Sequence, residues 1–322
     1  MRPNTDWFHQ AKWGVFSQWF TSHETTARAW NERVDGVDAE GLAAQLAGVG
    51  AKYFFMSVGQ NSGHYCAPND TYDRLTGISP SKCSRRDLMV DLAKAFEPHG
   101  IRLLAYLPSG APTMDPVACE KLQWEWGFTT PWPGGWGGPT TGKRLAEFQH
   151  NWEAICREWS QRWGGGCHGW WIDGCYFAKD MYDHADGPNW SSLAAALKAG
   201  NPNAIVSFNP GTLLPLNTPT TVEDFTAGEA GHGLPVNVYE NNFDQWSPLN
   251  RWVNKSAQAH VLSDVGFRVK VKYPEELIAG YTKLITGHGG VMSWWIRQDD
   301  RGLIIEEDLA QLSALNRAMR KR

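Results

Sequence analysis

Two acidic side chains stand in segments whose composition suits catalysis. Asp173 ends the apolar run of WWIDG (170–174), where hydrophobic residues give way abruptly to an acid and a glycine. Glu229 lies between glycines in EDFTAGEAGHG (223–233), a segment without helical spacing. Two carboxylates that flank one bond, one ionised and one protonated, form the arrangement that cleaves glycosidic linkages. The residue types therefore predict Asp173 as a nucleophile and Glu229 as its acid/base partner.

Both carboxylates also have a structural interpretation. Asp173 could cap a following helix or form a turn with Gly174, and Glu229 could be an ordinary solvated loop acid. Five further acids remain open as alternatives, although each of them is more often a solvated or hydrogen-bonding residue: Glu24, Glu32, Glu240, Asp299 and Asp300.

The elements around these acids alternate between apolar runs and amphipathic segments. Strands are expected at 11–20, 52–58, 101–107, 168–174, 204–208 and 290–296, with weaker candidates at 222–226, 236–239 and 260–262. Helices are expected at 38–50, 85–100, 145–163, 193–197, 274–289 and near the C-terminus, around Leu309 to Met319. This order predicts an α/β fold, a single (β/α)8 TIM-type barrel over 1–322, with a long Gly/Pro/Trp-rich loop at 108–141.

The predicted barrel places Asp173 where active sites of this fold lie. Active sites of such barrels lie at the C-terminal ends of the strands, and Asp173 ends the expected fourth strand. The following Gly174 lets a substrate approach closely.

Tryptophan is the compositional anomaly, with 18 residues against 13 Phe and 9 Tyr. Trp152, Trp159 and Trp163 follow one helical face and are predicted to be core. Indoles near strand ends can instead stack on the apolar face of a sugar ring, whose hydroxyls then form hydrogen bonds at the edge.

Bulk composition excludes several classes of partner. The net charge of −4 and a pI near 6.2 give no attraction to nucleic acid or anionic membranes. Six scattered cysteines form no zinc or disulfide pattern, and no phosphate loop or dinucleotide fingerprint occurs. We therefore expect a carbohydrate substrate, no cofactor, no metal and, without a visible signal peptide, a cytoplasmic location. The oligomeric state stays open.

Several motifs resemble the α-L-fucosidases of glycoside hydrolase family 29, and the resemblance covers most of the chain. KWGVFSQW (12–19) and AKYFFMSVGQNSGHYC (51–66) are similar to the first two strand segments of that family. WWIDG (170–174) is similar to the W-F-D-G motif that carries the nucleophile of the family, EDFTAGE (223–229) to a segment with a downstream acid, and GHGGVMSWWIRQDDRGLI (287–304) to the last strand and its loop.

The resemblance implies a retaining double displacement with Asp173 as nucleophile, Glu229 as acid/base and Trp171 as a wall of the sugar pocket. By this resemblance we expect a divergent member without the C-terminal β-sandwich common in the family. The expected substrate-binding residues are Gln18, Trp19, Gln60, Asn61, His64, Trp171 and Trp295.

Three of these positions depart from the family. Gln18, Gln60 and Asn61 stand where the family places histidines that hold the sugar hydroxyls, and no arginine lies between Arg162 and Arg251. Amides donate and accept hydrogen bonds, so a sugar can still be bound, but with another hydroxyl pattern. The sequence thus predicts an exo-acting glycosidase for a fucose-related or other terminal sugar, with an inverting glycosidase or a non-catalytic carbohydrate-binding barrel as alternatives.

Overall fold

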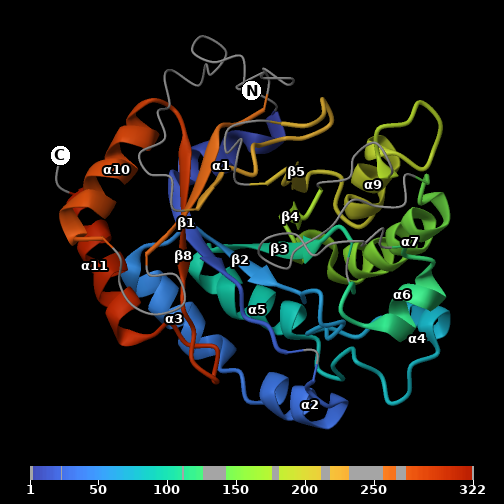
Figure 1. Cartoon of the computed structure of the whole chain (residues 1–322). Coiled ribbons are helices and arrows are strands. Elements are labelled where there is room, and N and C mark those ends of the chain that lie inside the picture. The colour runs from blue at the N-terminus through green and yellow to red at the C-terminus, as the bar shows by residue number, and fades with distance from the viewer. Residues whose placement is uncertain are drawn as a thin grey trace.

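A computed structural model describes residues 3–22, 24–110, 112–125, 143–175, 181–211, 218–231, 257–265 and 273–320. Eight parallel strands form one curled sheet surrounded by helices (Figure 1). The strands are β1 (Trp13–Ser17), β2 (Tyr53–Ser57), β3 (Arg102–Pro108), β4 (Gly169–Asp173), β5 (Ile205–Phe208), β6 (Glu229–Gly231), β7 (His260–Asp264) and β8 (Val291–Ile296). Their order, β5-β4-β3-β2-β1-β8-β7-β6, is that of a (β/α)8 barrel and confirms the predicted fold class.

The two edges of this sheet are joined just before β6. The main-chain amide of Asp224 donates to the carbonyl of Val206 on β5 at 2.8 Å. On the other side, Phe225 forms a parallel bridge with Gln258, which precedes β7. The segment predicted as a strand at 222–226 therefore forms the closure, while the regular strand begins at Glu229.

Helices cover the outside of the barrel (Figure 1). They are α1 (Asp6–Ala11), α2 (Ala27–Asp35), α3 (Ala39–Val49), α4 (Asp70–Thr76), α5 (Leu88–Phe96), α6 (Pro116–Leu122), α7 (Ala146–Trp163), α9 (Trp190–Leu197), α10 (Glu275–Gly287) and α11 (Glu306–Arg320). The expected helices at 38–50, 85–100, 145–163, 193–197, 274–289 and the C-terminus are confirmed within a few residues. The candidate strand at 236–239 lies outside the described residues.

Local signals explain where these helices begin and end. Asp38 accepts a hydrogen bond from the amide of Gly41 and starts α3, which stops at Gly50 in the left-handed conformation. On α7, the predicted core indoles Trp152, Trp159 and Trp163 are buried. Trp163 stacks on Trp170 of β4 at 5.4 Å, so the amphipathic stripe fixes the helix against the outer face of the barrel.

The predicted loop at 108–141 contains regular structure that its glycines and prolines obscure. Asp115 accepts from the amides of Val117 and Ala118, and Pro116 occupies the first turn, so α6 forms within this region. Residues 126–142 lie outside the described part of the chain. No described helix is long and apolar enough to cross a membrane.

The strands alternate between two cores. Trp170 and Ile172 of β4 face the helices, whereas Trp171 faces the barrel interior. The interior is mostly aromatic, and Phe8 of α1 closes its N-terminal end by packing on Tyr53 at 4.9 Å. Phe8 therefore fills the N-terminal end, and Asp173 lies at the opposite, C-terminal end of the strands.

Candidate active site

The C-terminal end of the barrel gathers polar and aromatic side chains from its strands. By strand alternation, the positions that continue the interior face are Gln18 after β1, Asp173 on β4, Asn209 after β5, Glu229 on β6, Asp264 on β7 and Trp295 on β8. Tyr106 of β3 and Gln60 after β2 join them through hydrogen bonds. We call this set the lip.

Asp173 accepts three hydrogen bonds at the lip. Its Oδ2 accepts from the hydroxyl of Tyr106 at 2.5 Å, and its Oδ1 accepts from Asn209 Nδ2 at 2.9 Å and from the amide of Gly174 at 2.8 Å. Donors of this kind favour the ionised form of a carboxylate and hold it in one orientation. The group is therefore placed as a fixed, partly exposed carboxylate, as a nucleophile must be.

Main-chain bonds between neighbouring strands fix the position of this carboxylate. The amide of Ser109, directly after β3, donates to the carbonyl of Asp173 at 2.7 Å. The amide of Asn209 donates to the carbonyl of Ile172 at 2.7 Å. Strands β3, β4 and β5 thus stay in register up to the lip, and Asp173 sits on rigid structure.

Glu229 is joined to Asp173 through a single side chain. Asn209 Nδ2 donates to Glu229 Oε2 at 2.6 Å as well as to Asp173. The amide of Gly211 donates to Asn209 Oδ1 at 3.1 Å, which turns the nitrogen of the amide toward the two acids. The structure therefore brings the two predicted carboxylates together, with an amide between them.

Burial and mutual repulsion change the acidity of this pair. Burial, followed by the charge of Asp173, raises the pKa of Glu229 to about 7, although Asn209 opposes the shift. Burial also raises the pKa of Asp173, while Tyr106, Asn209 and Gly174 stabilise its charge. Among the described residues Asp173 has three donors and Glu229 has one, so Glu229 is the acid that holds a proton near neutral pH.

Gly228 explains how Glu229 reaches the lip. Its φ of +70° lies in the left-handed region, and a β-carbon at this position would lie 2.0 Å from the carbonyl oxygen of His260. The carbonyl of Gly228 accepts from the amide of Leu262 at 2.8 Å. Close contact with β7 therefore requires glycine immediately before the carboxylate.

The amides predicted to replace histidines lie at this end of the barrel. Gln60 is buried and donates through Nε2 to the hydroxyl of Tyr106, which connects it to Asp173. Gln18 and Asn61 are partly exposed, and the carbonyl of Asn61 accepts from the amide of Met114 at 2.8 Å. Gln60 thus belongs to the hydrogen-bond network of the carboxylates, whereas contacts of Gln18 and Asn61 with a sugar stay predictions.

Two predicted tryptophans differ in depth. Trp295 is partly exposed at the lip and contacts Phe16 with ring centroids 5.9 Å apart. Trp171 is buried two residues below Asp173, stacks on Tyr106 at 5.5 Å and donates to the carbonyl of Ala227 at 2.9 Å. Trp171 therefore packs beside Tyr106 on the adjacent strand, and its contact with substrate stays a prediction.

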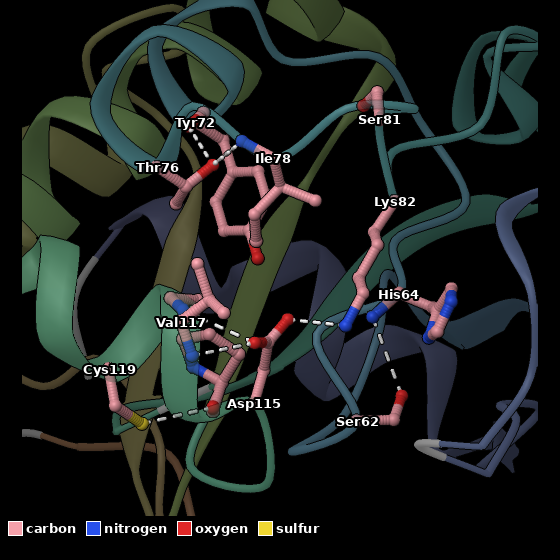
Figure 2. Close-up of polar contacts among 12 residues, drawn as sticks. Ser62, His64, Tyr72, Thr76, Ile78, Ser81, Lys82, Asp115, Val117 and Cys119 are labelled. Carbon is pink, nitrogen blue, oxygen red and sulfur yellow. Dashed lines mark hydrogen bonds and ion pairs between the residues drawn. The ribbon is translucent and has the colours of Figure 1, made fainter.

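Trp19 and His64 lie outside this network. Trp19 is buried in the outer core against Trp30, and the Arg33 guanidinium lies 4.6 Å from its ring centre. The His64 ring also contacts Trp30, and Figure 2 shows it directed away from the ion pair of Lys82.

His64 is buried, and neither ring nitrogen has a hydrogen-bond partner within 3.5 Å among the described residues. Burial, then the charge of Lys82, lowers the pKa of His64 to about 4, although the nearby Asp115 opposes this. The ring is therefore neutral at pH 7. The structure does not bring Trp19 or His64 together with the carboxylates.

Four of the five alternative acids lie on the exposed surface. Glu24, Glu32, Asp299 and Asp300 are exposed, and Glu32 pairs with Arg28 one helical turn away. Asp299 accepts from the amides of Arg301 and Leu303 and so stabilises the turn after β8. Glu240 lies outside the described residues.

Three lip residues were absent from the sequence prediction: Tyr106, Asn209 and Asp264. The apolar pattern at 101–107 predicts Tyr106 only as part of a buried strand, since its hydroxyl gives no signal in a hydrophobic run. Asn209 ends the predicted strand at 204–208, so its strand-end position could have identified it. Asp264 ends a strand whose pattern was weak.

Within the described ranges, no three His, Cys, Asp or Glu side chains gather as a metal site would require.

Comparison with solved structures places this geometry in a known kind of fold. The chain aligns along its whole length with 94% of the endo-fucoidan hydrolase P5AFcnA from glycoside hydrolase family 107, at 15% identity and a TM-score of 0.69. It covers 53% of the endo-fucoidan hydrolase MfFcnA4 of the same family, with a TM-score of 0.70 and 16% identity.

Fucosidases share the same architecture. An α-L-fucosidase of family 29 from Bacteroides thetaiotaomicron, trapped as a covalent intermediate, matches 99% of this chain and 75% of its own at 15% identity and a TM-score of 0.63. No family model and no curated protein matches the sequence. The chain is thus a TIM-type barrel with the fold of fucose-processing glycoside hydrolases, and the likeness does not single out family 29.

Proposed function

We propose that this protein is a retaining exo-glycosidase that removes a fucose-type sugar, with Asp173 as nucleophile and Glu229 as acid/base. The observation that carries the proposal is the amide shared by the two acids. One nitrogen bonds Asp173 Oδ1 at 2.9 Å and Glu229 Oε2 at 2.6 Å, so these oxygens lie at most about 5.5 Å apart. Retaining glycosidases hold their carboxyl groups about 5–5.5 Å apart, whereas inverting ones need about 6.5–9.5 Å to admit water.

The protonation states support the same assignment. A double displacement needs an ionised nucleophile and a protonated acid at the start. The three donors to Asp173 favour its charge, and Glu229, with a pKa raised to about 7 by burial and by Asp173, carries the proton at mildly acidic pH. Asp173 would attack the anomeric carbon while Glu229 protonates the leaving oxygen. Glu229, then ionised, would activate water to release the sugar.

The fold neighbours suggest the sugar class. Proteins of this architecture include α-L-fucosidases and endo-fucoidan hydrolases. Because the fit to an endo-fucoidan hydrolase is closer, with a TM-score of 0.69 against 0.63, cleavage inside a fucose-containing polymer is the second candidate. Products distinguish the two, since an exo-enzyme releases monosaccharide and an endo-enzyme releases oligosaccharides.

The test combines a substrate screen with trapping of the intermediate. Wild type should hydrolyse an aryl α-L-fucoside or a fucosylated oligosaccharide with retained anomeric configuration, followed by NMR. A 2-fluoro-fucosyl fluoride should label Asp173, detected by peptide mass spectrometry, and Asp173→Asn should be inactive and unlabelled. Inverted product, or full activity of Asp173→Asn, would refute the mechanism. If nothing is cleaved while sugars still change the tryptophan fluorescence, the protein is a carbohydrate-binding barrel.

A further inference from the structure

A directed chain of three hydrogen bonds leads from the main chain after β2 to Asp173. The amide of Asn61 donates to Gln60 Oε1 at 2.9 Å, and Gln60 Nε2 donates to the hydroxyl of Tyr106. That hydroxyl donates in turn to Asp173 Oδ2 at 2.5 Å. Gln60 is therefore connected to the carboxylate through the phenol of a second residue.

The amide of Asn61 fixes the direction of this chain. A peptide N–H donates and does not accept, so the side-chain atom of Gln60 that faces it has to be the oxygen. The oxygen and nitrogen of a glutamine amide are otherwise easily exchanged, and here the main chain decides between them. The NH2 group of Gln60 consequently faces the phenol oxygen of Tyr106, which accepts from it and donates its own proton to Asp173.

The loop after β2 holds Gln60 in this position. The carbonyl of Asn61 accepts from the amide of Met114 at 2.8 Å. The amide of Val58, two residues before Gln60, donates to the carbonyl of Tyr106 at 3.0 Å, so the same main chain is bonded to the residue that carries the phenol. Gln60 itself is only 7% exposed. Burial and these bonds restrict its side chain to one orientation.

The order of the bonds strengthens the last of them. A hydroxyl that accepts a hydrogen bond becomes a better donor, because each bond polarises the next one. The bond from Tyr106 stabilises the charge of Asp173 and opposes the rise in its pKa that burial causes. By accepting from Gln60, the phenol is therefore both oriented and polarised toward the carboxylate.

Direct contact with the sugar is the competing interpretation of Gln60, and it is the one that the sequence predicts. The Oε1 atom of Gln60 and one N–H of its Nε2 are, however, used within the protein. A buried side chain that is bonded at both ends is suited to fixing its neighbours. The structure therefore favours an effect of Gln60 on Tyr106 over direct contact with substrate.

We propose that Gln60 is a positioning residue, which orients the hydroxyl of Tyr106 so that its proton is donated to Asp173. The inference rests on the proposed function and adds to it the means by which the nucleophile is held ready for attack. Gln60 acts here through Tyr106, and no contact of its own with the sugar is required. Its loss should therefore affect kcat more than KM.

The first test determines the direction of the chain in the wild-type protein. A neutron crystal structure of perdeuterated protein at neutral pH should show the deuterated nitrogen of Gln60 facing the phenol. It should also show the hydroxyl deuteron of Tyr106 directed at Asp173 Oδ2. The side-chain oxygen of Gln60 facing Tyr106, or the hydroxyl deuteron facing Gln60, would overturn the proposal. This test needs no substrate, so its result is separate from a failure of the proposed function.

The second test measures the effect of the Gln60 amide on catalysis. In Gln60→Met, which keeps the length of the side chain and removes its amide, kcat should fall about 3- to 10-fold while KM changes less than about 2-fold. The acidic limb of the kcat/KM profile, where Asp173 gains its proton, should move to higher pH by about 0.3 unit or more, because a weaker donor stabilises the charge less. Glu229 and its bond to Asn209 are unchanged in this variant.

A double-mutant cycle separates action through Tyr106 from direct sugar binding. In the Tyr106→Phe background, Gln60→Met should change neither kcat nor the acidic limb further, because the phenol that transmits the effect is gone. Gln149→Met is the matched control, since Gln149 is a buried amide that bonds Glu153 and the carbonyl of Asn189 outside the barrel, and its loss should leave the limb in place.

Three outcomes of the cycle would overturn the proposal: an unmoved acidic limb in folded Gln60→Met, an equal shift with and without the phenol of Tyr106, or a loss confined to KM. Should Gln60→Met not fold, or should wild type cleave no substrate, the neutron structure decides on its own.

Discussion

The hydroxyl of Tyr106 donates a 2.5 Å hydrogen bond to Oδ2 of Asp173 from the neighbouring strand. Gln60, which follows β2, donates to the same hydroxyl, and Trp171, the register partner of Tyr106 on β4, stacks on its ring. The phenol is thus held by Gln60 and Trp171, and its hydroxyl donates to the carboxylate. This bond stabilises the charge of Asp173, the proposed nucleophile, before substrate binds.

We predict that Tyr106→Phe lowers kcat/KM by roughly 10- to 100-fold, the range that a hydrogen bond of about 1.5–3 kcal/mol to a charged group implies. The acidic limb of the pH profile should move to higher pH, because loss of this donor raises the pKa of Asp173 further. Tyr72→Phe is the control, since its buried hydroxyl has no partner among the described residues. An unmoved acidic limb would show that Tyr106 does not stabilise the charge of Asp173.

The sequence predicts the two carboxylates, Asp173 and Glu229, but not the side chains that form hydrogen bonds with them. Asp173 and Glu229 were recognisable because each acid follows an abrupt change from apolar residues or glycine. The role of Tyr106 is not predictable from the sequence, because a tyrosine in an apolar strand has the pattern of a core residue. Its hydroxyl reaches Asp173 only through the register of β3 with β4.

The tryptophans also show what the sequence pattern does not determine, namely which face of a strand a residue occupies. Trp19 and Trp295 both end apolar strand segments in the sequence, but Trp19 faces the outer helices and Trp295 faces the lip. The difference is one residue of strand register, which periodicity in a run buried on both faces does not determine. The barrel itself was predictable, because its helices carry caps and amphipathic stripes, whereas the weak pattern at 222–226 became an irregular closure.

Asn209 offers the most direct test of the shared amide. Its bond lowers the pKa of both Asp173 and Glu229. We therefore predict that Asn209→Ala lowers kcat/KM at least 30-fold and moves both limbs of the pH profile to higher pH. Asn203→Ala, in the exposed turn before β5, serves as the matched control. Limbs that stay in place would mean that the amide only shapes the pocket.

Glu229 should set the basic limb of the activity profile. In the proposed mechanism glycosyl transfer to Asp173 needs protonated Glu229, so kcat/KM should fall as pH rises through about 7, where this group loses its proton. In Glu229→Gln this limb should disappear, with a loss of at least 100-fold for poor leaving groups and a smaller loss for activated aryl fluorides, which need no protonation. Steady-state kinetics between pH 4.5 and 9 give both results. Persistence of the limb in Glu229→Gln would assign it to another group.

The same pKa makes a prediction about stability. The folded pKa of Glu229, about 7, lies above its usual value near 4.5, so the folded protein keeps a proton that the unfolded chain releases. This contribution is present below pH 4.5 and is lost as pH rises through about 7. Glu229→Gln should thus stabilise the protein by about 1–3 kcal/mol at pH 8 and very little at pH 5, measured by urea denaturation. Exposed Glu24→Gln should have no pH-dependent effect, and an equal gain at both pH values would contradict the raised pKa.

The close contact of Gly228 with β7 positions Glu229, the proposed acid/base. A β-carbon there would overlap the carbonyl of His260 at 2.0 Å, and the φ of +70° is strained for any other residue. Gly228→Ala should therefore destabilise the protein by more than about 2 kcal/mol and, where it folds, lower kcat because Glu229 is displaced from Asn209. Gly280→Ala is the matched control, since a β-carbon at that position in α10 meets nothing within 4 Å and alanine favours the helix by about 0.5–1 kcal/mol. Equal melting temperatures for the two variants would mean that β6 and β7 can separate at little cost, and the 2.6 Å bond from Asn209 to Glu229 would then not depend on this contact.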